Sequence, residues 1–293
     1  MRISSWNEKH IGITFILFAS LMWALEPVAA KIAYRSSDFI QTSAVRALFA
    51  FLVALLYVIL RGKGKELKVK REKIPYILFI ALIGSSFADL LYFYAISRIP
   101  VVNAVIIGHM QPIFIILLGF LILREALTIY DYGGILFMML SGIMVTTRTF
   151  QNLSTFHIGT FGDALVLLST IAWASTALVA RKYLRKVNAG VISFYRFLIT
   201  FILLFLYLSF FSSFNIFIPQ IAVGIIVGMG TIFYYEAIHR IKAAQVSALE
   251  LSSPFFAALL GFFILHEKIT GMQIFGMMLL FMGIYFLAKR EES

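Results

Sequence analysis

The feature that most constrains this chain is a series of apolar segments, each about 20 residues long, joined by short polar connectors. An α-helix of that length can cross the hydrocarbon core of a bilayer. Of the 293 residues, 61% are hydrophobic and 13% are charged, which is more apolar surface than a soluble domain can bury in one core. Lipid offers the backbone no hydrogen-bond partner, so the sequence predicts that every span is helical.

Ten such spans fill the chain, five in each half, and they leave no room for a soluble domain. Residues 1–10 lack the basic stretch, apolar core and cleavage site of a signal peptide, so we expect the first span to stay in the mature protein. The predicted spans are Ile11–Tyr34, Ile40–Leu60, Pro75–Ser97, Val101–Leu123, Leu127–Thr147, Gly162–Lys182, Gly190–Phe211, Phe217–His239, Ala243–Leu265 and Ile269–Lys289.

The formal net charge of +11 would suggest a nucleic-acid partner in a soluble protein. Here the basic residues lie mostly in connectors between spans, where orientation in a membrane explains them, so no nucleic-acid binding is expected. If the N-terminus is cytoplasmic, eighteen Lys and Arg residues lie inside. Four lie outside, namely Arg35, Arg98, Arg148 and Lys268. The positive-inside rule therefore predicts a multi-pass protein of the plasma membrane with both termini in the cytoplasm.

An internal repeat relates the two halves of the chain. At an offset of 150 residues the first two spans match the sixth and seventh, as Trp23 matches Trp173. At an offset of 142 residues, Leu117–Leu123 and Leu259–Leu265 both read Leu-Leu-Gly-Phe-x-Ile-Leu. A unit with an odd number of spans must re-enter the membrane upside down, which predicts a pseudo-two-fold axis in the membrane plane. The predicted units are 1–147 and 162–293, joined by an external linker at 148–161.

These repeated features resemble the ten-helix EamA-type members of the drug/metabolite transporter superfamily, and the resemblance covers essentially the whole chain. Besides the doubled tryptophan, it is carried by the intramembrane pair Arg46 and Arg196 and by the mid-span prolines Pro112 and Pro254. It is also carried by a Gly-x5-Glu-x2-Thr ending, found at Gly119–Thr128 and at Gly261–Thr270.

The resemblance implies an all-α integral membrane protein with ten transmembrane helices arranged as two inverted five-helix repeats. It also implies an alternating-access carrier whose central cavity lies between helices one, three, four, six, eight and nine. Members of the superfamily move amino acids, drugs, nucleosides, sugars and phosphorylated metabolites. The resemblance therefore leaves the substrate open.

Charged side chains within spans cost roughly 2.5 to 3.5 kcal/mol each on insertion scales, so they usually face the bundle interior and mark pairs or pathways. At about 1.5 Å per helical residue, Glu26, Arg46, Asp89 and His109 all lie on the outer side of the midplane, where they can meet. We interpret Glu26 and Asp89 as substrate-binding or proton-accepting groups, because a carboxylate near mid-membrane loses its solvation. His109 is equally open to a packing role and to a role as ligand or proton relay.

Inverted symmetry places Arg196, Glu236 and Glu250 on the inner side of the midplane. Glu250 shares a helix face with Ser247 and Pro254, and it is a further candidate for substrate binding. Arg46 and Arg196 are either structural ion-pair or snorkelling residues or gate charges.

Two more acids and four aromatic residues complete the candidate residues. Glu125 and Glu267 fall at helix starts on opposite faces of the membrane, where a carboxylate acts as a helix cap or as a gate. Aromatic side chains at repeat-related positions serve either as cavity walls for the substrate or as ordinary membrane packing. These four residues are Trp23, Trp173, Tyr92 and Tyr234.

The chain has no cysteine, no Gly-rich phosphate loop, no zinc-type His spacing and no nucleophile elbow. We therefore expect no cofactor and no bound metal, and we disfavour an intramembrane enzyme that acts on lipid. A passive channel is a further alternative. The leading hypothesis is a secondary carrier of amino acids or related zwitterions, with export favoured by the resemblance. Nucleosides, sugars and drugs are alternative substrates.

The expected partners are a small-molecule substrate, the lipid bilayer and protons as a candidate coupling ion. The sequence leaves the oligomeric state open, and a monomer is plausible.

The predicted orientation can be tested with reporters. Because eighteen of the basic connector residues fall on one side, we expect a reporter fused after Ser293 to score as cytoplasmic. A reporter at 155, in the predicted external linker, should score as external. An external score at Ser293 would contradict both the orientation and the count of ten spans.

Overall fold

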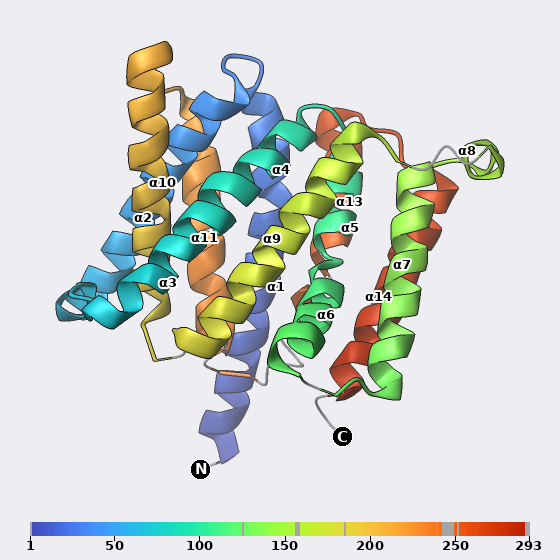
Figure 1. The fold of residues 1–293 in the computed structure, drawn as a ribbon, viewed down its shortest axis with the longest axis horizontal. Coiled ribbons are helices and arrows are strands. Elements are labelled where there is room, and N and C mark those ends of the chain that lie inside the picture. The colour runs from blue at the N-terminus through green and yellow to red at the C-terminus, as the bar shows by residue number, and fades with distance from the viewer. Residues whose placement is uncertain are drawn as a thin grey trace.

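The computed structural model describes residues 2–124, 126–155, 159–184, 186–238, 240–241, 249–250 and 252–290 of this chain. Within that part, the side chains of residues 2–7, 123, 181, 238, 288 and 290 are not described. The described chain is helical and contains no strand (Figure 1). Eight of its helical segments are long and apolar enough to cross a bilayer, which confirms the predicted all-α membrane fold class.

The first half of the chain forms five successive helical segments. The third segment consists of three consecutive helical elements, and the fourth is interrupted at residues 109–110. The elements are α1 (Arg2–Ala33), α2 (Phe39–Leu60), α3 (Ile74–Phe79), η3 (Ile80–Ala88), α4 (Asp89–Ile96), α5 (Val101–Gly108), α6 (Gln111–Leu123) and α7 (Ile129–Thr147). The short helices η1 (Gly64–Leu67) and η2 (Arg71–Lys73) lie in the basic connector after α2.

The second half repeats this order after the short helix α8 (Phe150–Ser154). Its elements are α9 (Phe161–Tyr183), α10 (Ala189–Phe211), α11 (Ile218–Ile238), α13 (Ser252–Leu265) and α14 (Gly271–Arg290). The apolar parts of the last two helices, Ser252–Leu265 and Gly271–Leu287, are shorter than the eight segments above. They lie where the ninth and tenth spans are predicted, and the count of ten spans stays a prediction.

Local sequence explains where several helices begin. Thr128 and Asp131 form a capping box at the start of α7, and Thr160 and Asp163 form another at the start of α9. In each box the threonine hydroxyl and the aspartate carboxylate satisfy backbone amides that have no partner within the helix. The first helix begins at Arg2 rather than near Ile11. Its polar first turns continue the helix beyond the apolar segment, since a helix supplies its own backbone partners in water as well as in lipid.

The third and fourth spans are irregular helices. The fourth span breaks between Gly108 and Gln111, which places Pro112 in the first turn of α6, as the missing amide of proline favours. Pro254 likewise lies in the first turn of α13. The third span contains the π-helix η3, which the sequence does not predict.

The helices pack in pairs that relate one half of the chain to the other. Helix α2 packs against α10, α5 against α13, and α7 against α14. Helix α1 packs against α11, while its counterpart α9 packs against η3 and α4. This exchange is the pattern that an inverted repeat produces, although the repeat layout and the unit boundaries stay predictions.

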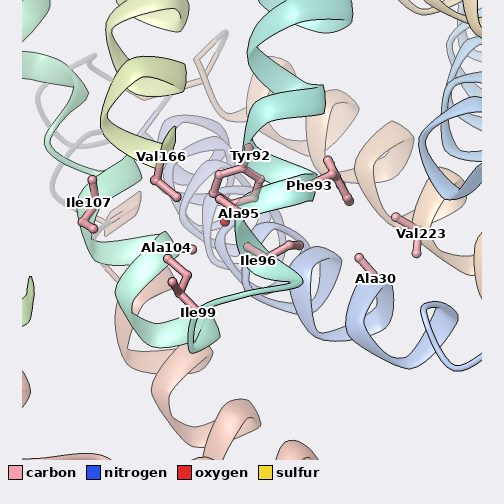
Figure 2. Packing of buried hydrophobic residues seen from close by; sticks show 10 residues of the cluster. All are labelled: Ala30, Tyr92, Phe93, Ala95, Ile96, Ile99, Ala104, Ile107, Val166 and Val223. Carbon is pink, nitrogen blue, oxygen red and sulfur yellow. The ribbon is translucent and has the colours of Figure 1, made fainter. Parts of the chain in front are cut away.

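The two ends of the bundle differ. The start of α1 and the end of α14 lie at the same end, together with the basic connector 61–73, and we call this the basic end (Figure 1). The opposite end carries α8, and we call it the linker end. An apolar cluster from α1, α4, α5, α9 and α11 fills the bundle towards the linker end (Figure 2). Its buried members are Ala30, Tyr92, Phe93, Ala95, Ile96, Ile99, Ala104, Ile107, Val166 and Val223.

Helices α7 and α14 approach closely through two glycines. A Cβ atom added at Gly283 would lie 3.0 Å from the carbonyl oxygen of Gly134 and 2.5 Å from Cγ of Met138. We expect Gly283→Ala to destabilise this helix pair by about 1–3 kcal/mol, because the extra methyl group overpacks a small-residue contact. The apparent melting temperature in detergent measures the effect.

Gly271→Ala is the matched control on the same helix, because a Cβ there has nothing within 4 Å. Equal melting temperatures for the two variants would show that the close approach of α7 and α14 is wrong.

Candidate functional site

A cavity of about 530 Å³ lies in the middle of the bundle. That volume is within the range of small-molecule sites in proteins. All eight residues predicted to bind substrate line it, as do Arg46 and Arg196. That these eight residues bind substrate stays a prediction. The eight are Trp23, Glu26, Asp89, Tyr92, His109, Trp173, Tyr234 and Glu250.

A buried arginine joins three helices at the edge of the cavity. Arg46 on α2 is only 4% exposed. Its Nε donates to Oε1 of Glu26 on α1 at 2.5 Å, and its Nη1 donates to Oδ2 of Asp89 on α4 at 2.9 Å. The guanidinium also lies over the ring of Phe93, 4.7 Å from its centroid. The predicted meeting of Glu26, Arg46 and Asp89 is therefore present, with the arginine bridging both acids.

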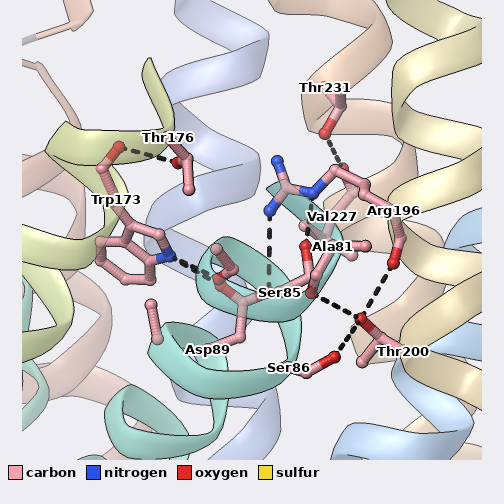
Figure 3. Close-up of polar contacts among 12 residues, drawn as sticks. Ala81, Ser85, Ser86, Asp89, Trp173, Thr176, Arg196, Thr200, Val227 and Thr231 are labelled. Atoms are coloured by element: carbon pink, nitrogen blue, oxygen red, sulfur yellow. Dashed lines mark hydrogen bonds and ion pairs between the residues drawn. The ribbon is translucent and has the colours of Figure 1, made fainter. Parts of the chain in front are cut away.

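Asp89 is held from its other side by the second half of the chain (Figure 3). Trp173 on α9 donates its indole N–H to Oδ1 of Asp89 at 2.8 Å and to the carbonyl oxygen of Gly84 at 3.1 Å. Arg196 on α10 donates from Nε to the Ser85 hydroxyl at 2.6 Å, and its Nη2 lies 3.8 Å from Oδ2 of Asp89. Arg196, from the second repeat, thus lies beside Asp89, from the first repeat.

The π-helix η3 explains how α9 and α10 reach these groups. The Gly84 carbonyl oxygen accepts the backbone N–H of Asp89, five residues on, and also the Trp173 indole N–H from another helix. Gly84 also lets α9 approach, since a Cβ there would lie 3.2 Å from Cγ2 of Thr176. Ser85 and Ser86 then face α10, where Ser86 shares a 3.0 Å hydrogen bond with Thr200. Our sequence reasoning missed Gly84 and Ser85, whose only signal is a run of small residues in an apolar span.

Two aromatic pairs flank the cavity. Trp23 on α1 meets Tyr234 on α11 with ring centroids 5.1 Å apart and an interplanar angle of 53°. Trp173 on α9 meets Tyr92 on α4 at 5.2 Å and 54°. The tryptophans are repeat partners, and so are the tyrosines. The two pairs therefore form walls of nearly identical geometry, each built from both halves of the chain.

Glu250 and His109 line the cavity but do not join the Arg46 cluster. Among the described residues, the Glu250 carboxyl has no hydrogen-bond or ion-pair partner. Nδ1 of His109 lies 2.7 Å from the carbonyl oxygen of Val105, so Nδ1 carries the proton. Its Nε2 is then a buried acceptor, and it has no partner within the described chain. Among the described residues no hydrogen bond joins His109 to Glu26 or Asp89, and its Nδ1–H is taken up by the Val105 carbonyl oxygen.

The remaining charged candidates that the structure describes lie outside the cavity wall. Glu267 accepts the N–H of Val101 at 2.8 and 3.0 Å, at the first residue of α5, and it pairs with Nζ of Lys31 at 2.6 Å. It therefore caps a helix of the other half of the chain. Glu236 contacts Arg61 and Arg240 near the basic end. Glu125 lies outside the described residues, as does Ser247 beside the Glu250 face.

The cavity extends towards one end of the bundle. Its wall includes Ala180 near the end of α9 and Ile192 near the start of α10, and both are close to the basic end. Towards the linker end, the apolar cluster of Figure 2 fills the space beyond Asp89 and Tyr92. The contact between Glu267, Lys31 and the start of α5 lies at that closed end.

The Arg46 bridge makes a stability prediction. We expect Arg46→Gln to destabilise the fold by about 3 kcal/mol, because Glu26 and Asp89 would be left buried without their shared cation. Combining it with Glu26→Gln should recover part of that loss, since one of the unpaired charges is then removed. Melting in detergent checks both. A double variant as unstable as Arg46→Gln alone would argue against the bridge.

Comparison with known proteins places the chain among membrane transporters. The EamA-like transporter family matches this chain twice, over residues 10–147 and over residues 160–289. An uncharacterised transporter of Methanothermobacter thermautotrophicus is 26% identical over 97% of this chain and 88% of its own. The riboflavin transporter ImpX of Fusobacterium nucleatum is 24% identical over 96% of this chain and 99% of its own. The pseudopaline exporter CntI of Pseudomonas aeruginosa is 34% identical over 31% of each chain.

A solved structure titled "Crystal structure of protein" superposes with a TM-score of 0.64. It covers 98% of this chain and 99% of its own at 18% identity, which supports the fold alone. The two family matches together span most of the sequence, one over each half. The chain belongs to the EamA-like transporter family and is a multi-pass membrane transporter.

Proposed function

We propose that this transporter is an alternating-access carrier of small organic metabolites, that its substrates are amino acids or related zwitterions, and that it exports them. The observation that carries this proposal is the charge pattern of the cavity wall. Arg196 presents a guanidinium whose side chain is 26% exposed, and Glu250 presents a carboxyl without a described partner. One wall thus offers a cation and an anion to the same ligand.

The other two acids of the cavity wall already have partners. Arg46 bridges Glu26 and Asp89, so each of these two acids already has a cation of the protein beside it. A zwitterion can place its carboxylate at Arg196 and its ammonium group at Glu250, so that each of its two ends meets an opposite charge. A phosphorylated metabolite would bring about two negative charges to one cation that Asp89 already attracts.

The shape of the cavity supports alternating access. It reaches towards the basic end and is closed towards the linker end by packed apolar side chains. We propose that the basic end is cytoplasmic in a plasma membrane and that both termini lie there. The structure is then an inward-facing form. The name of the pseudopaline exporter supports outward transport as the direction for this chain.

Protons are the candidate coupling ion. A coupled carrier needs a carboxyl that changes protonation between its two forms, and of the three cavity acids only Glu250 has no described cation beside it. A uniporter would instead keep this carboxylate ionised and simply use it to hold the substrate amine. An imposed pH gradient separates the two cases, because coupling drives uphill accumulation and uniport does not.

Transport by purified protein in liposomes tests the proposal. We expect saturable counterflow of at least one zwitterion from a broad metabolite panel, and accumulation driven by a proton gradient. Glu250→Gln should lower transport roughly tenfold, since hydrogen bonds to charged groups contribute about 1.5–3 kcal/mol. Glu66→Gln is the control, because Glu66 lies in the exposed connector.

Each part of the proposal has its own contrary result. Flux without saturation or counterflow would indicate a channel. Lipid turnover by the same liposomes would indicate an enzyme. Saturable transport of neutral solutes alone would remove the zwitterion, and accumulation that ignores the proton gradient would remove the coupling.

A further inference from the structure

The connector between α2 and α3 concentrates positive charge at the basic end. Its thirteen residues, 61–73, include seven basic and two acidic side chains. The corresponding connector of the second half, residues 212–217, contains no charged residue. Orientation in a membrane needs only an excess of basic residues on one side. Neither the repeat nor the orientation therefore accounts for so much charge in one connector.

This connector is folded against the bundle. The hydroxyl group of Tyr195 on α10 donates to the carbonyl oxygen of Leu67 at 2.6 Å. The side chain of Val69 packs against an apolar cluster that contains Ile77 on α3 and Leu184 at the end of α9. A hydrogen bond and an apolar contact thus hold the middle of the connector in one place.

The folded connector turns its unpaired cations outward. Leu67 and Val69 are half-buried, whereas the basic side chains around them are exposed. Three of the seven basic residues each lie beside an acidic partner. The other four have no ion pair and no side-chain hydrogen bond to any residue that the structure describes. These four are Lys65, Lys68, Lys70 and Arg71.

The end of α9 adds a fifth cation beside the connector. Tyr76 on α3 stacks on Tyr183 of α9, with ring centroids 4.1 Å apart and an interplanar angle of 5°. Nζ of Lys182 lies 5.3 Å from the centroid of the Tyr183 ring, and the Lys182 side chain is exposed. We call the five exposed cations the basic patch, namely Lys65, Lys68, Lys70, Arg71 and Lys182.

The apolar residues that flank the connector place it at the edge of the hydrocarbon layer. The segment Phe39–Leu60 is long and apolar enough to span a bilayer. Its last residue, Leu60, is 76% exposed, and Ile74, the first residue after the connector, is 42% exposed. Exposed apolar side chains at the end of a span face lipid. The connector therefore begins and ends at the level of the lipid headgroups.

We propose that the basic patch binds the headgroups of anionic phospholipids in the leaflet at the basic end. Ammonium and guanidinium groups form charge-assisted hydrogen bonds with phosphate oxygens. The attraction adds up over several basic residues that face one anionic surface. None of the patch residues lines the cavity, so the proposal does not depend on the proposed substrate or on its direction of transport.

The experiment measures thermal stabilisation of the detergent-solubilised full chain by added phospholipid over a concentration series. Phosphatidylglycerol and phosphatidylcholine with the same acyl chains are matched probes, because only the first carries a net negative charge. We expect phosphatidylglycerol to stabilise the protein at concentrations roughly tenfold below those of phosphatidylcholine. The difference should shrink when the salt concentration rises from about 0.05 M to about 0.5 M, because salt screens exposed charges.

A combined variant removes the four connector charges of the patch, and it should lose the preference for phosphatidylglycerol. Its substitutions are Lys65→Gln, Lys68→Gln, Lys70→Gln and Arg71→Gln. A matched control removes four exposed basic residues elsewhere on the chain, and it should keep the preference because the patch is intact. The control substitutions are Lys9→Gln, Arg35→Gln, Arg98→Gln and Lys268→Gln.

Equal stabilisation of the wild-type protein by the two lipids would overturn the proposal, and so would a preference that persists in the patch variant. Equal losses in the patch variant and the control would assign the effect to net charge and also overturn it. Inorganic phosphate that stabilises the wild type as strongly as phosphatidylglycerol, at equal concentration, would indicate a site for soluble anions instead of lipid.

A smaller pair of variants keeps the test decisive if the fourfold patch variant does not fold. Lys68→Gln combined with Lys70→Gln should then reduce the preference for phosphatidylglycerol. Lys9→Gln combined with Arg35→Gln should leave the preference unchanged. Equal preference in these two double variants would overturn the proposal.

Discussion

The structure depends on one buried arginine between two carboxylates. In lipid an isolated charge is costly, and a pair removes most of that cost only when its geometry is good. Arg46 achieves this with separate nitrogens for Glu26 and Asp89, and the bridge joins α1, α2 and α4. Asp89, once fixed, orients the Trp173 indole and attracts Arg196. The shape of the cavity wall and the separation of its charges follow from this bridge.

Around the bridge, the aromatic and basic residues of the cavity follow the repeat, whereas the acidic residues do not. Trp23 and Trp173, Tyr92 and Tyr234, and the two arginines of the cavity are repeat partners. The acids do not, because Thr176, Thr231 and Gly108 stand where inversion would place the counterparts of the three cavity acids. A symmetric frame suits a carrier, since its two halves can exchange conformations at similar cost. The asymmetric acids give the cavity a polarity, so a substrate with two unlike ends can bind in one preferred orientation.

The sequence predicts the fold class and much of the cavity wall, because both depend on properties that a single chain displays. Segment length predicts the spans, and depth along a helix predicts that Arg46 meets Glu26 and Asp89. Contacts between residues far apart in the sequence could not be predicted from segment length or depth. The partner of Glu267 is a backbone amide 166 residues away. The π-helix adds a residue per turn without a strong compositional signal, and the backbone contact of His109 competes with its tertiary partners.

The charges of the cavity constrain how such a carrier can cycle. Among the described residues, the wall holds two guanidinium groups and three carboxyl groups, so one negative charge is left over when every acid is ionised. A carrier must pass through an occluded form in which water no longer solvates that charge, and there an unpaired carboxylate is costly. A proton on Glu250 removes this charge and the ammonium group of a substrate pairs with it, whereas an empty and ionised site leaves the carboxylate unpaired. On the proposed function, the empty transporter therefore reorients slowly unless it is protonated. That difference favours exchange of substrate for protons over free uniport.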